Sequence, residues 1–287
     1  MLECGVYTAV VTPFEGEKLS CDCLKGLIDF QAEAGVRGVV VCGTTGEAPT
    51  LSHGEYESVL ERAVECAAGR IKVFAGIGSF DTKQAVSKTK LAHELGLDGM
   101  LAVTPYYNKP TQGGLIEYFR RIADSTDKPV MLYSVPSRCA VEIAVDTVKT
   151  LARECKNICA IKEATDSCAR VDAIREATSD DFMIFSGNDS MTIPFMSLGA
   201  GGVISVASNL IPREMIAIVK CACDGDYASA LAKYRKIYPI VNKLFIETNP
   251  LPIKYLLRKK GLIRSSECRS PLGKLSEKSM AELDKFL

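Results

Sequence analysis

Histidine is scarce in this sequence, which contains only His53 and His93, and these two are far apart in the chain. Imidazole is among the commonest ligands of catalytic transition metals, so a histidine-rich metal site is hard to assemble from this sequence. The sequence therefore predicts chemistry without a bound metal.

An excess of charge is also missing, because 35 Lys and Arg balance 35 Asp and Glu and no Lys/Arg-rich run occurs. A nucleic-acid partner would require a basic surface, so we expect none. No apolar stretch approaches the roughly eighteen residues that a membrane-spanning helix needs. The first five residues lack the basic and apolar regions of a signal peptide. We expect a cytoplasmic protein without a membrane partner.

The 12 cysteines form no C-x-x-C pair. Two C-x-C pairs occur, Cys21/Cys23 and Cys221/Cys223, but neither has a matching second pair or histidines at zinc-finger spacing. Most of the remaining cysteines fall inside apolar runs. We interpret them as small hydrophobic side chains.

Apolar runs alternate with amphipathic stretches along the first three quarters of the chain. The runs predicted as strands are residues 5–11, 39–41, 73–77, 100–103, 130–133, 158–162, 183–185 and 202–206. Eight strand–helix pairs predict a parallel (β/α)₈ TIM barrel over residues 1–224, followed by a C-terminal helical extension over residues 225–287. A Rossmann-type sheet is the alternative, and the absence of G-x-G-x-x-G after an early strand weighs against it.

Lys162 stands at the end of the apolar run that begins at Ile158. Active sites of such barrels form at the C-terminal ends of the strands. Burial lowers the pKa of a lysine because the charged form loses its hydration, and a neutral amine is a nucleophile. A lysine that extends from the strand end to solvent is the alternative interpretation. Lys162 is the candidate nucleophile.

Further polar residues follow other strands and fall on the same predicted rim. The Gly43–Glu47 turn, with Thr44 and Thr45, offers hydroxyl and backbone N–H groups to a carboxylate, or its hydroxyls cap the next helix. Tyr133 and Tyr107 can transfer protons, although each tyrosine alone is more often a packing residue. Arg138 can bind a second carboxylate through its planar guanidinium, or lie on the surface.

This combination indicates carbon–carbon bond chemistry on a keto acid. Neutral Lys162 would attack the ketone of a pyruvate-like substrate, and the resulting imine would accept electrons while a methyl proton leaves. The enamine would then add to an aldehyde. We expect no cofactor.

The sequence resembles the pyruvate-dependent class I aldolase family that includes dihydrodipicolinate synthase and N-acetylneuraminate lyase, over nearly the whole chain. The resemblance is carried by Gly43–Glu47, Thr104–Asn108, Tyr133–Arg138, Ile161–Ala164, Gly187–Asp189 and Asn249–Lys254. It implies a (β/α)₈ barrel, a homotetramer built as a dimer of dimers, and pyruvate as a substrate.

The resemblance also implies a role for individual residues. Lys162 would form the Schiff base, and Thr45 would hold the pyruvate carboxylate. Tyr133, Thr44 and a neighbouring subunit's Tyr107 would relay protons. Arg138 would meet aspartate semialdehyde, and the backbones of Gly187 and Ile204 would line the pocket.

Within the family, Thr44-Thr45 and the arginine Arg138 resemble the synthases of the diaminopimelate and lysine pathway more than the sialic acid lyases. Ser134 and Cys139-Ala140 depart from the common family pattern, and they stand beside Arg138, the residue that would meet the second substrate. His53, Phe80 and Gln84 stand where lysine-inhibited relatives place an effector site, and a carboxylate for the ammonium of lysine is missing. We expect weak or absent inhibition by lysine. A non-catalytic binding protein on this scaffold is the remaining alternative.

Overall fold

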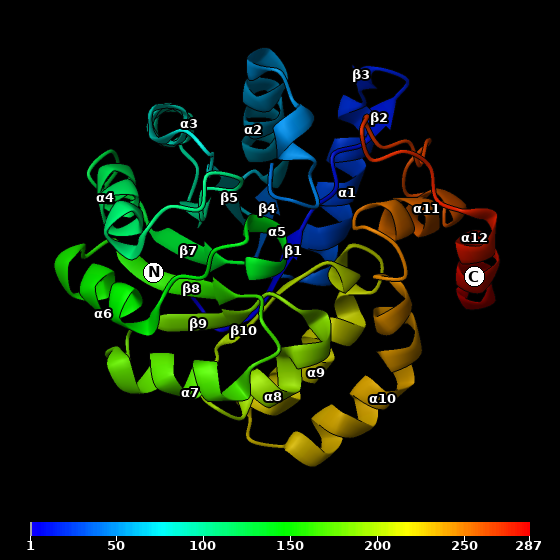
Figure 1. The fold of residues 1–287 in the computed structure, drawn as a ribbon. Coiled ribbons are helices and arrows are strands. Elements are labelled where there is room, and N and C mark those ends of the chain that lie inside the picture. The colour runs from blue at the N-terminus through cyan, green and yellow to red at the C-terminus, as the bar shows by residue number, and fades with distance from the viewer. Residues whose placement is uncertain (1) are drawn as a thin grey trace. The chain divides into compact units, whose positions relative to one another are not determined.

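The computed structural model describes residues 2–287, and its central feature is a closed barrel of eight parallel strands (Figure 1). The strands are adjacent in the order β1-β10-β9-β8-β7-β6-β5-β4. Their bounds are β1 (Gly5–Ala9), β4 (Gly38–Val41), β5 (Lys72–Gly76), β6 (Gly99–Val103), β7 (Val130–Ser134), β8 (Ile158–Glu163), β9 (Met183–Ser186) and β10 (Gly202–Ser205). The predicted TIM barrel is confirmed.

Each barrel strand is followed by a helical connection, as a right-handed parallel crossover requires. The helices of the barrel are α1 (Cys21–Ala34), α2 (His53–Ala67), α3 (Thr82–Glu94), α4 (Gln112–Ala123), α6 (Val145–Glu154), α7 (Cys168–Ala177), α8 (Thr192–Met196) and α9 (Pro212–Cys223). Local sequence explains their ends. Ser52 and Glu55 form a capping box at the start of α2, and Gly35 ends α1 with a φ of 86°.

The residues form two compact units, which are described separately: one holds residues 2–4 and 74–204, the other residues 5–73 and 205–287. In the first unit, α3, α4, α6 and α7 pack one against the next (Figure 1). The predicted division into residues 1–224 and 225–287 stays a prediction.

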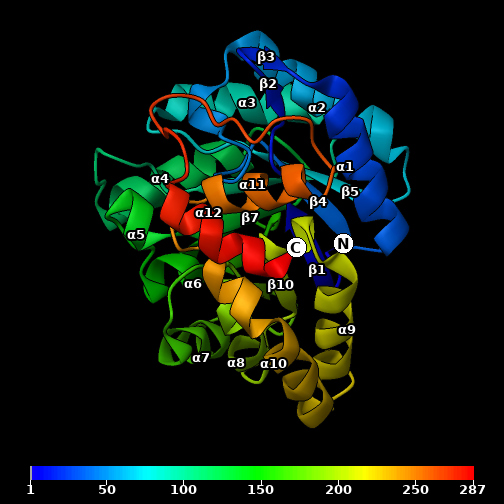
Figure 2. The ribbon, with the colours of Figure 1, turned by 90° about the vertical axis from the view of Figure 1, so that its right-hand side faces the viewer.

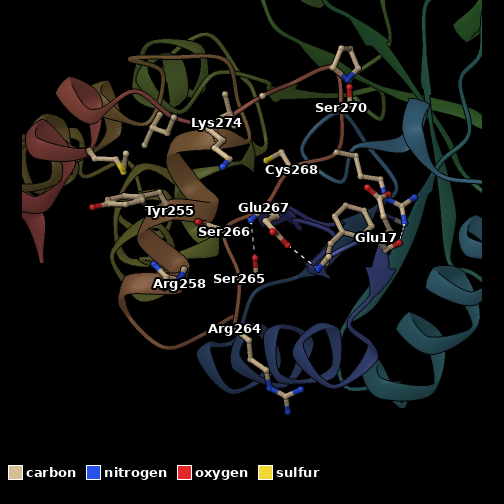
Figure 3. Close-up of a pocket in the computed structure, with 18 residues that line it drawn as sticks. Glu17, Tyr255, Arg258, Arg264, Ser265, Ser266, Glu267, Cys268, Ser270 and Lys274 are labelled. Atoms are coloured by element: carbon tan, nitrogen blue, oxygen red, sulfur yellow. Dashed lines mark hydrogen bonds between the residues drawn. The ribbon is translucent and has the colours of Figure 1, made fainter.

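The second unit contains the C-terminal helices α10 (Tyr227–Lys243), α11 (Leu251–Lys259) and α12 (Glu277–Leu283), with α12 against α10 and α11 (Figure 2). An extended segment connects α11 to α12 and borders a pocket of about 750 Å³. Ser265, Glu267, Cys268 and Ser270 follow one another along this segment (Figure 3). Across residues 2–287, no helix has the length and apolar character needed to cross a membrane.

Two elements differ from the sequence-based expectation. A short hairpin of β2 (Phe14–Glu15) and β3 (Lys18–Leu19) follows β1, with Gly16 at a φ of 58° in its turn. No helix is predicted directly after β7, but Pro136–Cys139 forms the one-turn helix α5. Proline at its start fixes φ in the helical range, which favours this turn.

Candidate active site

Lys162 lies on β8 between two neighbouring strands of the barrel. It is paired in register with Tyr133 on β7 and with Phe185 on β9. The lysine is only 5% exposed, and its Nζ lies 4.3 Å from the centre of the Tyr133 ring. The predicted nucleophile is therefore a buried side chain that contacts one of the predicted proton carriers, and the alternative of a lysine extending to solvent is wrong.

Burial lowers the pKa of Lys162 from 10.5 to about 8, because the ammonium form loses its hydration. The negative charge of Asp189 opposes this shift, and the positive charge of Arg138 adds to it. At pH 7 an amine with this pKa is neutral in roughly a tenth of the molecules, about 300 times the fraction of an ordinary lysine. Lys162 thus has a larger neutral fraction near neutral pH than an ordinary lysine.

The strand end that carries Lys162 is fixed by the next residue, Glu163. Its side chain is fully buried, and its Oε2 accepts a hydrogen bond of 2.8 Å from Arg170 Nε. Burial raises the pKa of Glu163, and the Arg170 guanidinium offsets part of that shift. Arg170 also donates to the Ile143 carbonyl, at 2.5 Å. This buried ion pair anchors β8 to α7 directly beside the lysine.

Gly187 follows β9 and lies close to the same strand end. Its N–H donates to the Glu163 carbonyl at 2.7 Å, and a Cβ added here would stand 2.7 Å from the Cβ of Ala164. Only glycine therefore allows the two backbones to approach so closely. Ile204, also predicted to line the pocket, is fully buried on β10.

The other predicted residues of the first unit are more exposed. Arg138 is exposed on α5. Tyr107, in the connection between β6 and α4, is 93% exposed and has a φ of 73°, a conformation uncommon for residues other than glycine. Tyr107 thus projects away from the unit that carries it.

Thr44 and Thr45 belong to the second unit and lie in the tight turn after β4. The turn is closed by hydrogen bonds from the Gly46 N–H to the Gly43 carbonyl and from the Glu47 N–H to the Thr44 carbonyl, each 3.1 Å long. Thr45 is 3% exposed, and its Oγ1 accepts a hydrogen bond of 3.0 Å from Asn249 Nδ2. Thr44 is half-buried.

Among residues 2–287, no group of three or more His, Cys, Asp and Glu side chains is arranged to hold a metal ion.

The profile of the dihydrodipicolinate synthetase family matches residues 3–287. The chain belongs to this family. It is 44% identical to the 4-hydroxy-tetrahydrodipicolinate synthase of Aquifex aeolicus (strain VF5), over 99% of this chain and 96% of that protein.

Solved structures of other members of this family superpose closely on the chain. The 4-hydroxy-tetrahydrodipicolinate synthase of Methylacidiphilum fumariolicum SolV is 45% identical, with a TM-score of 0.96 over 98% of this chain and 94% of that one. A chloride-inhibited dihydrodipicolinate synthase from Acinetobacter baumannii, complexed with pyruvate, is 38% identical, with a TM-score of 0.96 over 99% and 97%.

Sequence reasoning missed two features of this family member's sites. The Glu163–Arg170 pair was not anticipated, although an acidic residue placed directly after a buried run is a signal that a cationic partner is needed. Asn249 was noted only as part of a motif. Its contact with Thr45 joins positions 204 residues apart, which no local pattern reveals.

Proposed function

We propose that this chain is a 4-hydroxy-tetrahydrodipicolinate synthase, which condenses pyruvate with L-aspartate 4-semialdehyde in the diaminopimelate and lysine pathway. The observation that carries the proposal is the buried Lys162, with a pKa of about 8, at the end of β8 in a member of the dihydrodipicolinate synthetase family. Pyruvate as the first substrate is also supported by the related Acinetobacter baumannii enzyme complexed with pyruvate.

In the proposed mechanism, the neutral Nζ of Lys162 attacks the ketone carbon of pyruvate, and water leaves to form a protonated imine. The imine nitrogen accepts the electron pair when a methyl proton is removed, which gives an enamine. The enamine carbon then attacks the aldehyde carbon of the semialdehyde, whose oxygen takes up a proton. The amino group that came with the semialdehyde then attacks the imine carbon, which closes the ring of the product and expels the Lys162 amine, and its proton passes to the leaving nitrogen.

The other site residues have supporting roles in this proposal. Thr45 donates to the carboxylate of pyruvate, and Gly187 and Ile204 line its pocket with their backbones. Tyr133 passes protons together with Thr44. Arg138 binds the carboxylate of the semialdehyde, since a guanidinium can donate two parallel hydrogen bonds to it.

Tyr107 completes the proton relay from a neighbouring subunit. The exposure of its side chain, 93%, supports this role, because a tyrosine that leaves its own subunit is available to another. We propose that the enzyme is a homotetramer, built as a dimer of dimers, and that it acts in the cytoplasm. It requires no metal or organic cofactor, because the lysine itself provides the electron sink.

The proposal is tested by reducing the enzyme with borohydride in the presence of pyruvate and mapping the adduct by peptide mass spectrometry. We expect a pyruvyl adduct on Lys162 and none on Lys254, a second buried lysine that serves as an internal control. Aspartate semialdehyde added before borohydride should discharge the adduct. An adduct insensitive to the semialdehyde would indicate a related aldolase, and no adduct would support a non-catalytic protein.

A further inference from the structure

The turn that carries Thr44 and Thr45 is held by a distant segment, Asn249–Lys254, of the same compact unit. Asn249 is 6% exposed, and its Nδ2 donates to Thr45 Oγ1 over 3.0 Å. Five residues later, Lys254 Nζ lies 2.6 Å from Glu47 Oε1, and both side chains are fully buried. The segment thus contacts the turn at its middle and at its end.

The contact with Asn249 restricts what the Thr45 hydroxyl can do. A hydroxyl has one hydrogen to donate and two lone pairs to accept. Because the Asn249 amide occupies a lone pair as a donor, the hydrogen of Thr45 is not used in this contact and is left for another acceptor. A carboxylate oxygen is such an acceptor.

Contacts of Gly46 also hold the backbone of the turn, which limits how far the Thr45 hydroxyl can move from Asn249. Thr12 Oγ1 donates to the Gly46 carbonyl at 2.7 Å. A Cβ added at Gly46 would lie 3.0 Å from the Cys42 nitrogen, so the turn fits tightly against the end of β4. The hydrogen bond from Asn249 is therefore made to a hydroxyl on a rigid support.

We propose that Asn249 is a positioning residue for the pyruvate carboxylate, acting through Thr45. Its amide donates to Thr45 Oγ1 and so keeps the hydroxyl hydrogen directed at the substrate. This inference rests on the proposed function, in which Thr45 binds the carboxylate. It adds a residue that does not itself touch pyruvate.

The test measures the pyruvate concentration that gives half-maximal borohydride trapping at Lys162. Loss of one hydrogen bond of ordinary strength predicts an increase of about tenfold in Asn249→Ala. The amount of adduct at saturating pyruvate should stay at the wild-type level, because the lysine is untouched. Asn249→Asp keeps the shape but accepts the Thr45 hydrogen, so it should raise the half-maximal concentration at least as much.

A double-mutant cycle with Thr45→Val distinguishes positioning from a general loss of structure. If Asn249 acts through Thr45, adding Asn249→Ala to Thr45→Val should leave the half-maximal concentration unchanged. The matched control is Asn157→Ala, which removes amide hydrogen bonds of 2.9 and 2.8 Å to the Ala123 and Thr126 carbonyls in the other unit. This control should trap pyruvate like the wild type.

Two results would overturn this inference and leave the proposed function standing. The first is a half-maximal pyruvate concentration that is the same in Asn249→Ala, in Asn249→Asp and in the wild type. The second is an increase of about a hundredfold in the double variant, as expected if the two substitutions act independently. A wild-type enzyme that forms no adduct at all would instead overturn the proposed function, and this inference with it.

Discussion

The buried ion pair between Glu47 and Lys254 makes a strong prediction about stability. Lys254 Nζ donates to Glu47 Oε1 and to the Glu267 carbonyl, both at 2.6 Å. The second carboxylate oxygen of Glu47 accepts from the Arg269 N–H at 2.8 Å. Each oxygen of Glu47 therefore faces a donor, and neither charge is exposed to solvent.

Removing one partner leaves the other charge buried without its counter-ion, which typically costs about 3–5 kcal/mol. Lys254→Met has this effect on Glu47. Glu47→Gln has a comparable effect, because the glutamine has a single acceptor oxygen and its NH₂ group must face either Lys254 or the Arg269 N–H. At about 2–4 °C per kcal/mol, each single variant should lower the melting temperature by roughly 6–20 °C.

The double variant Glu47→Gln/Lys254→Met removes both charges and should recover at least about 2 kcal/mol of the summed losses. Chemical unfolding followed by circular dichroism gives the free energy of unfolding of the wild type, the two single variants and the double variant. A matched surface pair, Lys220 and Asp224, provides the control, because both side chains are exposed and solvent screens their charges, so removing either should leave stability almost unaltered. Strictly additive losses in the Glu47/Lys254 cycle would refute the reasoning.

Four further predictions concern activity, stability and inhibition. Adduct formation at Lys162 should rise about tenfold per pH unit below pH 8 and level off above it, since its pKa is about 8; a flat profile from pH 6 to 9 would contradict this. The pKa of Lys162 is about 8 in the folded protein and about 10.5 in the unfolded chain, so at pH 7 folding buries a charge that the site disfavours. Lys162→Met removes this charge, and the variant should be inactive yet about 3 kcal/mol more stable at pH 7, measured by urea unfolding. Tyr107→Phe should lower kcat about a hundredfold, because the proton relay loses its hydroxyl; wild-type turnover would exclude the relay. Free lysine should inhibit weakly, and half-inhibition at sub-millimolar lysine in a steady-state assay would refute this.

The barrel could be predicted from sequence because each of its elements has a local cause. Apolar runs define strands buried on both faces, and Ser52 and Gly35 give recognisable helix ends. The β2–β3 hairpin was missed because its strands have two residues each, too few for an alternating pattern. The helix α5 was missed because four residues, Pro136–Cys139, are too short for helical periodicity.

The candidate site likewise contains features that local sequence predicts and features that it does not. Lys162 could be predicted because an amine at the end of an apolar run is conspicuous. The contacts Asn249–Thr45 and Lys254–Glu47 of the second unit could not be predicted from sequence, since they join positions 204 and 207 residues apart. Which polar residues meet is decided by the closure of the fold and not by local spacing.

The two buried lysines show why burial alone does not identify a nucleophile. Lys254 is fully buried, yet its ammonium donates to a carboxylate and to a carbonyl, so its hydrogens are committed to the fold. For Lys162, desolvation outweighs the attraction of Asp189, and the neutral form with its free electron pair becomes accessible near pH 8. We therefore expect the lysine paired with a carboxylate to hold the fold together, and the lysine whose charge is only partly compensated to be the one that reacts.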